Sequence, residues 1–259
     1  MNSTFLEAVA KDLLQKYGNN LSQIAVVFPN KRASLFMNEY LARLSDGPLW
    51  SPCYTTISDL FREKSELMVA DPIKLVCDLY RSYTEITGKD ETLDRFYGWG
   101  QLLLADFDDI DKNMADAHKV FANLRDIHEL DDIDYLSPEQ KNILKSFFHN
   151  FADDHLSKLK ERFLSLWCNL EEIYRDFNQR LAAQGLAYEG ALYRSVVEAQ
   201  ADYEFDKYVF VGFNMLQQVE QRLFLTLKAQ GKALLSRQQR GWALHQRLSD
   251  SVPQRVECR

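Results

Sequence analysis

Glycine, proline and cysteine are scarce in this chain of 259 residues, which holds 10 Gly, 6 Pro and 4 Cys. Few glycines and prolines mean few tight turns, which favours a mainly helical chain. The cysteines are scattered and form no CxxC pair: Cys53, Cys77, Cys168 and Cys258. This spacing is typical of reduced, mostly buried cytoplasmic thiols and argues against a zinc site or a disulfide framework.

An excess of basic residues is also missing, because the formal net charge is −7. A general nucleic-acid coat would be basic, so that class is disfavoured, although a local basic groove stays compatible with the total. No signal peptide and no apolar run of membrane-spanning length is present. We therefore expect a soluble cytoplasmic protein with no membrane partner. With 46% hydrophobic residues, the chain can form one large domain or two small ones.

The most informative stretch is IAVVFPNKRASLFM, at residues 24–37. Its apolar run at 24–28 predicts a strand that is buried on both faces. Pro29 and Asn30 end this strand, and Lys31 and Arg32 open a helix. Apolar positions of the helix recur at helical spacing, namely Leu35, Phe36, Tyr40 and Leu41.

The corner between this strand and this helix is a candidate anion site. In open α/β sheets, ligands bind just beyond the carboxyl ends of the strands, where Asn30, Lys31 and Arg32 are expected. Backbone N–H groups at the start of the helix add to the positive potential there. Phosphate is the anion that this arrangement favours. The alternative is a surface corner with ordinary charges.

Further elements are expected on both sides of a long helical block. A helix at 5–17 is predicted to be capped by Asn2 or Ser3 and ended by Gly18. A short strand is expected after Pro52, followed by a helix capped by Ser58 or Asp59. Helices are predicted at 73–86, 93–106, 119–127, 138–151, 156–184 and 188–200. A strand at 207–213, a helix at 218–229 and a strand at 232–235 complete the pattern.

An acidic cluster lies near the middle of the chain, with Asp106, Asp108, Asp109 and Asp111 in the string DFDDID. A metal site is one interpretation. Helix caps and solvated charge are the interpretation that we favour. No Ser–His–Asp or Cys–His arrangement is supported by spacing, and the histidines are expected at the surface or in caps: His118, His128, His149 and His155.

Two segments resemble single-strand contacts of superfamily 1 helicases. FPNKRASLFM resembles motif Ia, T-F-T-N-K-A-A-x-E-M, and is closer still to the amino-terminal region of AddB-like proteins, the helicase-like partner subunits of helicase–nuclease complexes. The segment around Thr55 and Ser58 is similar to the T-x-H-S-L segment. DFDDID with the following F-x-N-L also resembles AddB-like proteins. The resemblance implies phosphate contacts at Asn30, Lys31 and Arg32, supported by the hydroxyl groups of Thr55 and Ser58.

The ATPase motifs of such motors are missing. The phosphate-binding loop G-x-x-x-x-G-K-[ST] needs glycine, and no glycine precedes Gly18. Alignment of D-E-x-Q-D-x-x-x-x-Q on Gln221 places Gly212 at the magnesium-binding Asp and Phe213 at the water-orienting Glu. Neither residue can perform that role, so we expect an inactive ATPase with no metal and no cofactor. The family's PD-(D/E)XK nuclease domain is also absent, which argues against an enzyme in this chain.

The predicted architecture is α/β, with a small parallel P-loop-NTPase-like (helicase-like) core at 1–70 and 201–235. An all-helical insertion is expected at 71–200. Residues 236–259 are predicted to form an irregular tail. Our hypothesis is that this tail is foreign to the fold and that the chain is a truncated or frame-shifted amino-terminal piece of a longer protein.

The resemblance implies a non-catalytic helicase-like domain of a DNA-repair and recombination nuclease. Such a domain would bind or guide single-stranded DNA, or scaffold a helicase-type partner subunit. The alternative is a helical protein-interaction domain with no nucleic-acid role, which the negative net charge and the aromatic helical block also suit.

Overall fold

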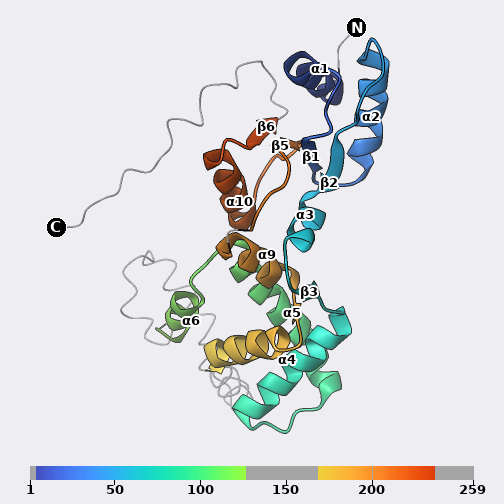
Figure 1. Ribbon diagram of the computed structural model, residues 1–259. Helices are drawn as coiled ribbons and strands as arrows, with labels where there is room; N and C mark the ends of the chain where they lie inside the picture. The colour runs from blue at the N-terminus through green and yellow to red at the C-terminus, as the bar shows by residue number, and fades with distance from the viewer. Residues whose placement is uncertain (1–3, 127–168, 200, 237–259) are drawn as a thin grey trace, which may run out of the picture. The chain divides into compact units, whose positions relative to one another are not determined.

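The computed structural model describes residues 4–126, 169–199 and 201–236. A further helix covers the described residues 169–182. The other elements, drawn in Figure 1, are α1 (Phe5–Tyr17), β1 (Ile24–Phe28), α2 (Arg32–Leu44), β2 (Cys53–Thr56), α3 (Ile57–Glu63), β3 (Met68–Val69), α4 (Pro72–Thr87), α5 (Leu93–Lys112), α6 (Ala117–Asp126), β4 (Leu186–Ala187), α9 (Glu189–Glu198), β5 (Lys207–Val211), α10 (Gln218–Ala229) and β6 (Ala233–Ser236). The helix predicted at 138–151 and the tail after Ser236 lie outside the described residues.

The main sheet has four strands in the order β2-β1-β5-β6. The β1–β5 and β5–β6 pairs are parallel, with Ile24 opposite Lys207 and Tyr208 opposite Ala233. The predicted mixed α/β class with a small parallel sheet is therefore confirmed. Sequence analysis missed a second, two-stranded parallel sheet of β3 and β4, whose strands have two residues each.

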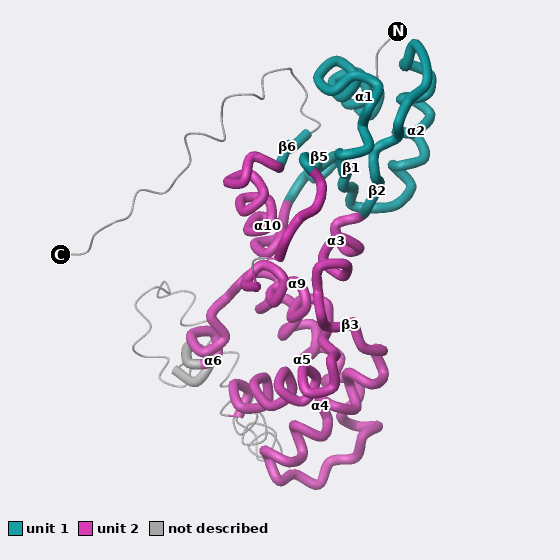
Figure 2. Tube along the Cα trace, viewed as in Figure 1, with its two compact units in different colours: residues 1–55, 206–215, 233–259 teal, residues 56–205, 216–232 magenta. Residues whose placement is uncertain are grey.

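The chain divides into two compact units, shown in different colours in Figure 2. Unit 1 comprises residues 1–55, 206–215 and 233–259, and unit 2 comprises 56–205 and 216–232. The domains expected from sequence placed α3 and α10 with the α/β core, whereas both helices fall in unit 2. That division into a core and an insertion stays a prediction.

The core of unit 1 lies between the sheet and the helices α1 and α2. Every residue of β1 is buried, as the apolar run predicts. On one face, side chains of β1 and β5 pack with Leu13 of α1 and with Met37 and Leu41 of α2. The alternate strand residues Ala25, Val27, Tyr208 and Phe210 point the other way and are buried too.

The core of unit 2 is aromatic. Phe96 of α5 is fully buried, and its ring centroid lies 4.3 Å from that of Trp99 and 5.1 Å from that of Tyr83 on α4. Phe107, further along α5, packs against Tyr174 at 5.1 Å. The prediction that the aromatic side chains of the helical block form a core is confirmed for these residues.

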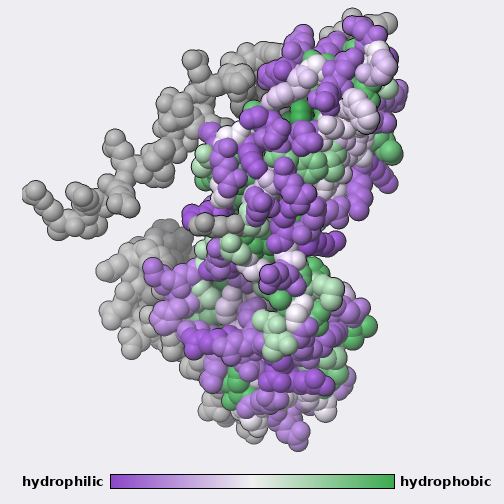
Figure 3. Space-filling model, viewed as in Figure 1, coloured by the Kyte–Doolittle hydropathy of each residue, from purple (hydrophilic) through white to green (hydrophobic). Residues whose placement is uncertain are grey.

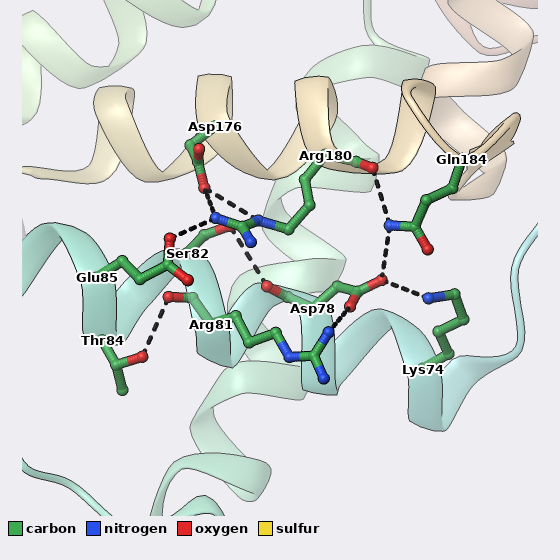
Figure 4. Close-up of polar contacts among 9 residues, drawn as sticks. All are labelled: Lys74, Asp78, Arg81, Ser82, Thr84, Glu85, Asp176, Arg180 and Gln184. Carbon is green, nitrogen blue, oxygen red and sulfur yellow. Dashed lines mark hydrogen bonds and ion pairs between the residues drawn. The ribbon is translucent and has the colours of Figure 1, made fainter.

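A polar network joins α4 to the helix at 169–182 in unit 2 (Figure 4). Its centre is Asp78, whose side chain is 2% exposed and lies 2.8 Å from the ammonium of Lys74. The amide of Gln184 donates to the same carboxylate at 3.4 Å. Arg180 bridges Glu85 of α4 and Asp176 of its own helix, at 2.6 and 3.1 Å. The buried charge of Asp78 is thus paired within α4, and the contacts to the neighbouring helix are the amide of Gln184 and the exposed ion pair of Arg180 with Glu85.

Three local predictions need correction. The cap of α1 is Thr4, whose hydroxyl accepts from the N–H of Glu7, because Thr4 directly precedes Phe5, where the helix begins as predicted. The cap of α3 is Thr56, and Ser58 and Asp59 lie inside the helix. Cys53 is exposed and Cys77 is half-buried, so the thiols that the structure describes are not mostly buried.

The acidic cluster is solvated charge only in part, since Asp106 and Asp109 are exposed and the other two aspartates are not. The helix α5 continues to Lys112, so all four aspartates lie within it. Asp111 is 1% exposed, and Asp108 forms an ion pair with Lys112 at 2.7 Å. The metal interpretation also finds no support, since no group of three or more metal-ligating side chains occurs among the described residues.

The face of the molecule drawn in Figure 3 is largely hydrophilic, with hydrophobic residues in patches between the polar ones. Within the described part of the chain, no helix has the length and apolar character needed to cross a membrane.

Candidate nucleic-acid interface

The strand order has a topological switch point between β1 and β5. The next strand along the chain, β2, lies on one side of β1 within the sheet, whereas β5 and β6 lie on the other side of β1. The direction of the strand order therefore reverses between β1 and β5. In open α/β sheets, ligands bind outside the carboxyl ends of the strands at such a switch point.

A hollow of about 370 Å³ lies at these strand ends, entirely within unit 1. Its lining comes from the start of α1, the ends of β1 and β5, and one side of α2: Thr4, Phe5, Leu6, Phe28, Pro29, Asn30, Ala33, Phe36, Tyr40, Val211 and Gly212. Apolar and aromatic side chains predominate, and Asn30 supplies a polar side chain at the rim.

The basic corner lies beside this hollow. Asn30, Lys31 and Arg32 are all exposed. Lys31 occupies the cap position of α2 without a capping side-chain hydrogen bond, and the first turn holds no acidic residue. Arg32 has no ion-pair partner among the residues that the structure describes. The positive end of the helix dipole and the two cations therefore act together at this corner.

The two positions that were aligned with the ATPase carboxylates, Gly212 and Phe213, follow β5. Gly212 lines the hollow and has φ 84°, which favours glycine over any residue with a side chain. A Cβ placed on Gly212 would come no closer than 4.0 Å to Pro29 Cδ, so conformation rather than space requires the glycine. Phe213 is 4% exposed and packs on Phe210, with ring centroids 6.0 Å apart. Neither position offers an oxygen ligand from its side chain.

The two supporting hydroxyl groups lie elsewhere. Thr55 is half-buried in β2 of unit 1 and does not line the hollow. Ser58 belongs to unit 2, where its hydroxyl accepts a hydrogen bond of 2.8 Å from Tyr193 Oη. Asn30 thus lines the same hollow as Gly212, with the two cations next to it in sequence, whereas Ser58 is engaged in an internal contact.

Sequence analysis missed the exposed apolar pair on α2. Leu35 and Phe36 are 72% and 54% exposed, although both were expected on the buried face. Met37 and Leu41 are the fully buried residues of this helix. Three consecutive apolar residues span about 200° of a helix, so they cannot all face one core. This geometric conflict signals that at least one of the three residues is exposed, without showing which one.

A second polar site occurs in unit 2, around the buried carboxylate of Asp111. It accepts hydrogen bonds from Tyr174 Oη at 2.7 Å, from Tyr188 Oη and from Arg194 at 3.2 Å. Burial, together with the hydrogen bond to Asp111 and its charge, raises the pKa of Tyr174 above its ordinary value. Burial and the same charge raise the pKa of Tyr188.

A hollow of about 410 Å³ is lined in part by Tyr174 and Arg194, which both donate hydrogen bonds to this carboxylate. Its charged groups are already paired: Glu171 contacts His118 at 3.0 Å and Arg175 at 2.8 Å, and Arg194 contacts Asp111. We therefore interpret this site as a structural network that joins α5, α9 and the helix at 169–182.

A comparison with models of known protein families finds none that matches this chain, and a search of curated proteins finds no match either. The resemblance to AddB-like proteins thus rests on the quoted motifs alone.

Proposed function

We propose that this chain is an inactivated, helicase-like domain of an AddB-like DNA-repair nuclease, and that unit 1 binds the backbone of single-stranded DNA. The exposed corner of Asn30, Lys31 and Arg32, beside the switch point of a parallel sheet, is the observation that carries this proposal. An amide and two cations next to uncapped backbone N–H groups are the donors that a phosphate requires.

The role is binding rather than ATP-driven movement. Gly212 and Phe213 follow β5, where a motor needs carboxylates for magnesium and water. A phosphate-binding loop is also missing from the sequence before β1. We propose that the domain guides a strand for a helicase-type partner subunit, which supplies the movement. ATP turnover that is lost on changing Lys31 to Ala would contradict this assignment.

Phosphate contacts position a strand without reading its sequence, so binding should be independent of base order and sensitive to salt. Two phosphates neutralised by Lys31 and Arg32 predict a slope of about −1.4 for log K against log salt concentration. Fluorescence anisotropy of a labelled oligothymidylate, titrated at several salt concentrations, measures this slope. Binding with no dependence on salt would exclude the proposed mechanism.

The second candidate function is docking of a partner protein on unit 2. The observation that favours it is a group of exposed apolar side chains at β3 and the first turn of α4, with Met68 at 68% and Ile73 at 61% exposure. Single exposed apolar residues are common, but neighbours in one short segment mark interaction sites more often. Two results together would favour this function. The wild type should pull down a partner that a Met68→Ser/Ile73→Ser variant does not, and the wild type should not bind DNA.

A further inference from the structure

The helix α2 presents cations and aromatic rings along one exposed side. Arg32, Phe36 and Arg43 are separated by four and seven residues, which places them within about 40° of one another around the helix. Phe36 is 54% exposed, and the side chain of Arg43 is 56% exposed. The buried residues Met37 and Leu41 lie on the opposite side of the helix.

Two contacts position Arg43, at the C-terminal end of this side of α2. The guanidinium carbon of Arg43 lies 5.0 Å from the centroid of the Tyr40 ring, in cation–π geometry. A carboxylate oxygen of Glu7 in α1 lies 3.6 Å from a guanidinium nitrogen of Arg43, so the two side chains form an ion pair. Tyr40 and Phe36 both line the hollow at the strand ends. Aromatic surface therefore connects the basic corner to Arg43.

The length of this side suits a strand that runs along the helix. Eleven residues separate Arg32 from Arg43, which corresponds to about 16 Å along the helix axis. Successive phosphates of a stacked strand are about 3.4 Å apart along its axis, so the distance accommodates several nucleotides. Base–aromatic stacking between flanking cations is the usual design of non-specific single-strand sites.

We propose that a single strand held at the Asn30–Arg32 corner continues along α2, with a base stacked on Phe36 and a further phosphate at Arg43. This inference rests on the proposed DNA-binding function. It adds a stacking site at Phe36, a phosphate contact at Arg43 and the course of the strand along α2. Glu39, exposed and four residues before Arg43, opposes the phosphate by its charge and limits the affinity.

Two labelled ligands of equal length separate stacking from charge: an oligothymidylate and an abasic deoxyribose-phosphate strand. Anisotropy titrations should show that Phe36→Ala weakens oligothymidylate binding about tenfold and leaves the abasic strand unchanged. Leu35→Ala removes the neighbouring exposed apolar side chain and should change neither affinity. Equal binding of the two ligands by the wild type would overturn the stacking site.

Charge variants test the phosphate contact at Arg43. Arg43→Gln should weaken both ligands and lower the salt slope by about 0.7, whereas Glu39→Gln should strengthen both. Circular dichroism verifies that each variant folds. If Lys31→Ala/Arg32→Ala abolishes binding but the Phe36 and Arg43 variants bind like the wild type, the course along α2 is wrong and the proposed function stands. If the folded wild type binds neither strand, the proposed function itself is wrong.

Discussion

At the residue scale, Asp111 has the most demanding environment among the described polar groups. Its carboxylate is 1% exposed and accepts from two tyrosines and one arginine on other elements. A buried charge is tolerated only when hydrogen bonds and opposite charge replace its water shell. Asp111 therefore acts as the polar centre that joins three helices of unit 2.

Replacing Asp111 with Asn should lower the free energy of unfolding by about 3 kcal/mol, because Arg194 would lose a buried anionic partner. Urea unfolding followed by far-UV circular dichroism measures the change. Asp109→Asn is the matched control, since Asp109 is exposed in the same helix and should change stability by less than about 0.5 kcal/mol. Equal effects of the two substitutions would show that the Asp111 network contributes little.

The same network predicts sensitivity to alkaline pH. The pKa values of Tyr174 and Tyr188 are raised in the folded state, first by burial and then by Asp111. In the unfolded chain a tyrosine ionises at about pH 10. Above that pH the unfolded state releases protons that the folded state retains, so stability is lost as pH rises towards the folded pKa values. Below pH 10 these groups contribute no pH dependence.

In Asp111→Asn the fall should level off at a lower pH than in the wild type, because burial still raises the two tyrosine pKa values but the carboxylate no longer does. Urea unfolding at intervals from pH 9 to pH 12 tests this difference. Other buried tyrosines, such as Tyr193, titrate in both proteins and cancel in the comparison. Parallel curves for the two proteins would remove Asp111 as a cause of the shift.

At the element scale, α5 contains two glycines in different surroundings. A Cβ added at Gly98 meets no heavy atom within 4 Å. A Cβ added at Gly100 would lie 2.4 Å from Cε1 of Phe96, whose ring is fully buried between Tyr83 and Trp99. The first glycine only weakens the helix, and the second makes room for the aromatic core.

Gly98→Ala should therefore raise the free energy of unfolding by about 0.5–1 kcal/mol, through improved helix propensity. Gly100→Ala should lower it by about 1–3 kcal/mol, because the buried Phe96 ring must move. Thermal or urea unfolding of the two variants provides the comparison. If both substitutions changed the free energy of unfolding in the same direction, the packing described for α5 would be contradicted.

Elements with a strong local pattern could be predicted from sequence. The apolar run of β1 and the amphipathic repeat of α10 led to boundaries that the structure confirms. Elements whose stability comes from distant partners could not. The strands β3 and β4 have two residues each and pair across more than one hundred residues, so no local period announces them.

The site shows the same contrast. The basic corner could be predicted, because Asn30, Lys31 and Arg32 directly follow a recognisable strand. The exposure of Phe36 could not be read from its apolar character, since the choice between Phe36 and Met37 as the buried residue depends on how α2 packs in unit 1. Asp111 had no signal either, because its partners lie 63 to 83 residues away in sequence.

At the scale of the whole molecule, the negative net charge and the proposed DNA contact are compatible. The acidic residues exceed the basic ones by seven, yet the corner at the strand ends has two cations and no acidic residue in the first turn of α2. Local potential rather than total charge determines a phosphate contact at short range, because salt screens distant charges within about 10 Å. The proposed DNA contact therefore depends on the charges at this corner and not on the net charge of the chain.

The most direct measurement is fluorescence anisotropy of a labelled oligothymidylate at low salt, with the wild type and two double variants. Lys31→Ala/Arg32→Ala removes the corner. Lys11→Ala/Lys16→Ala removes equal charge from exposed positions on α1 that do not line the hollow. We predict that the wild type and the α1 variant bind, and that the corner variant loses at least tenfold in affinity. Equal loss of affinity in both variants would show that net charge causes the binding, rather than a contact at this corner. Unchanged binding by the corner variant would contradict the account.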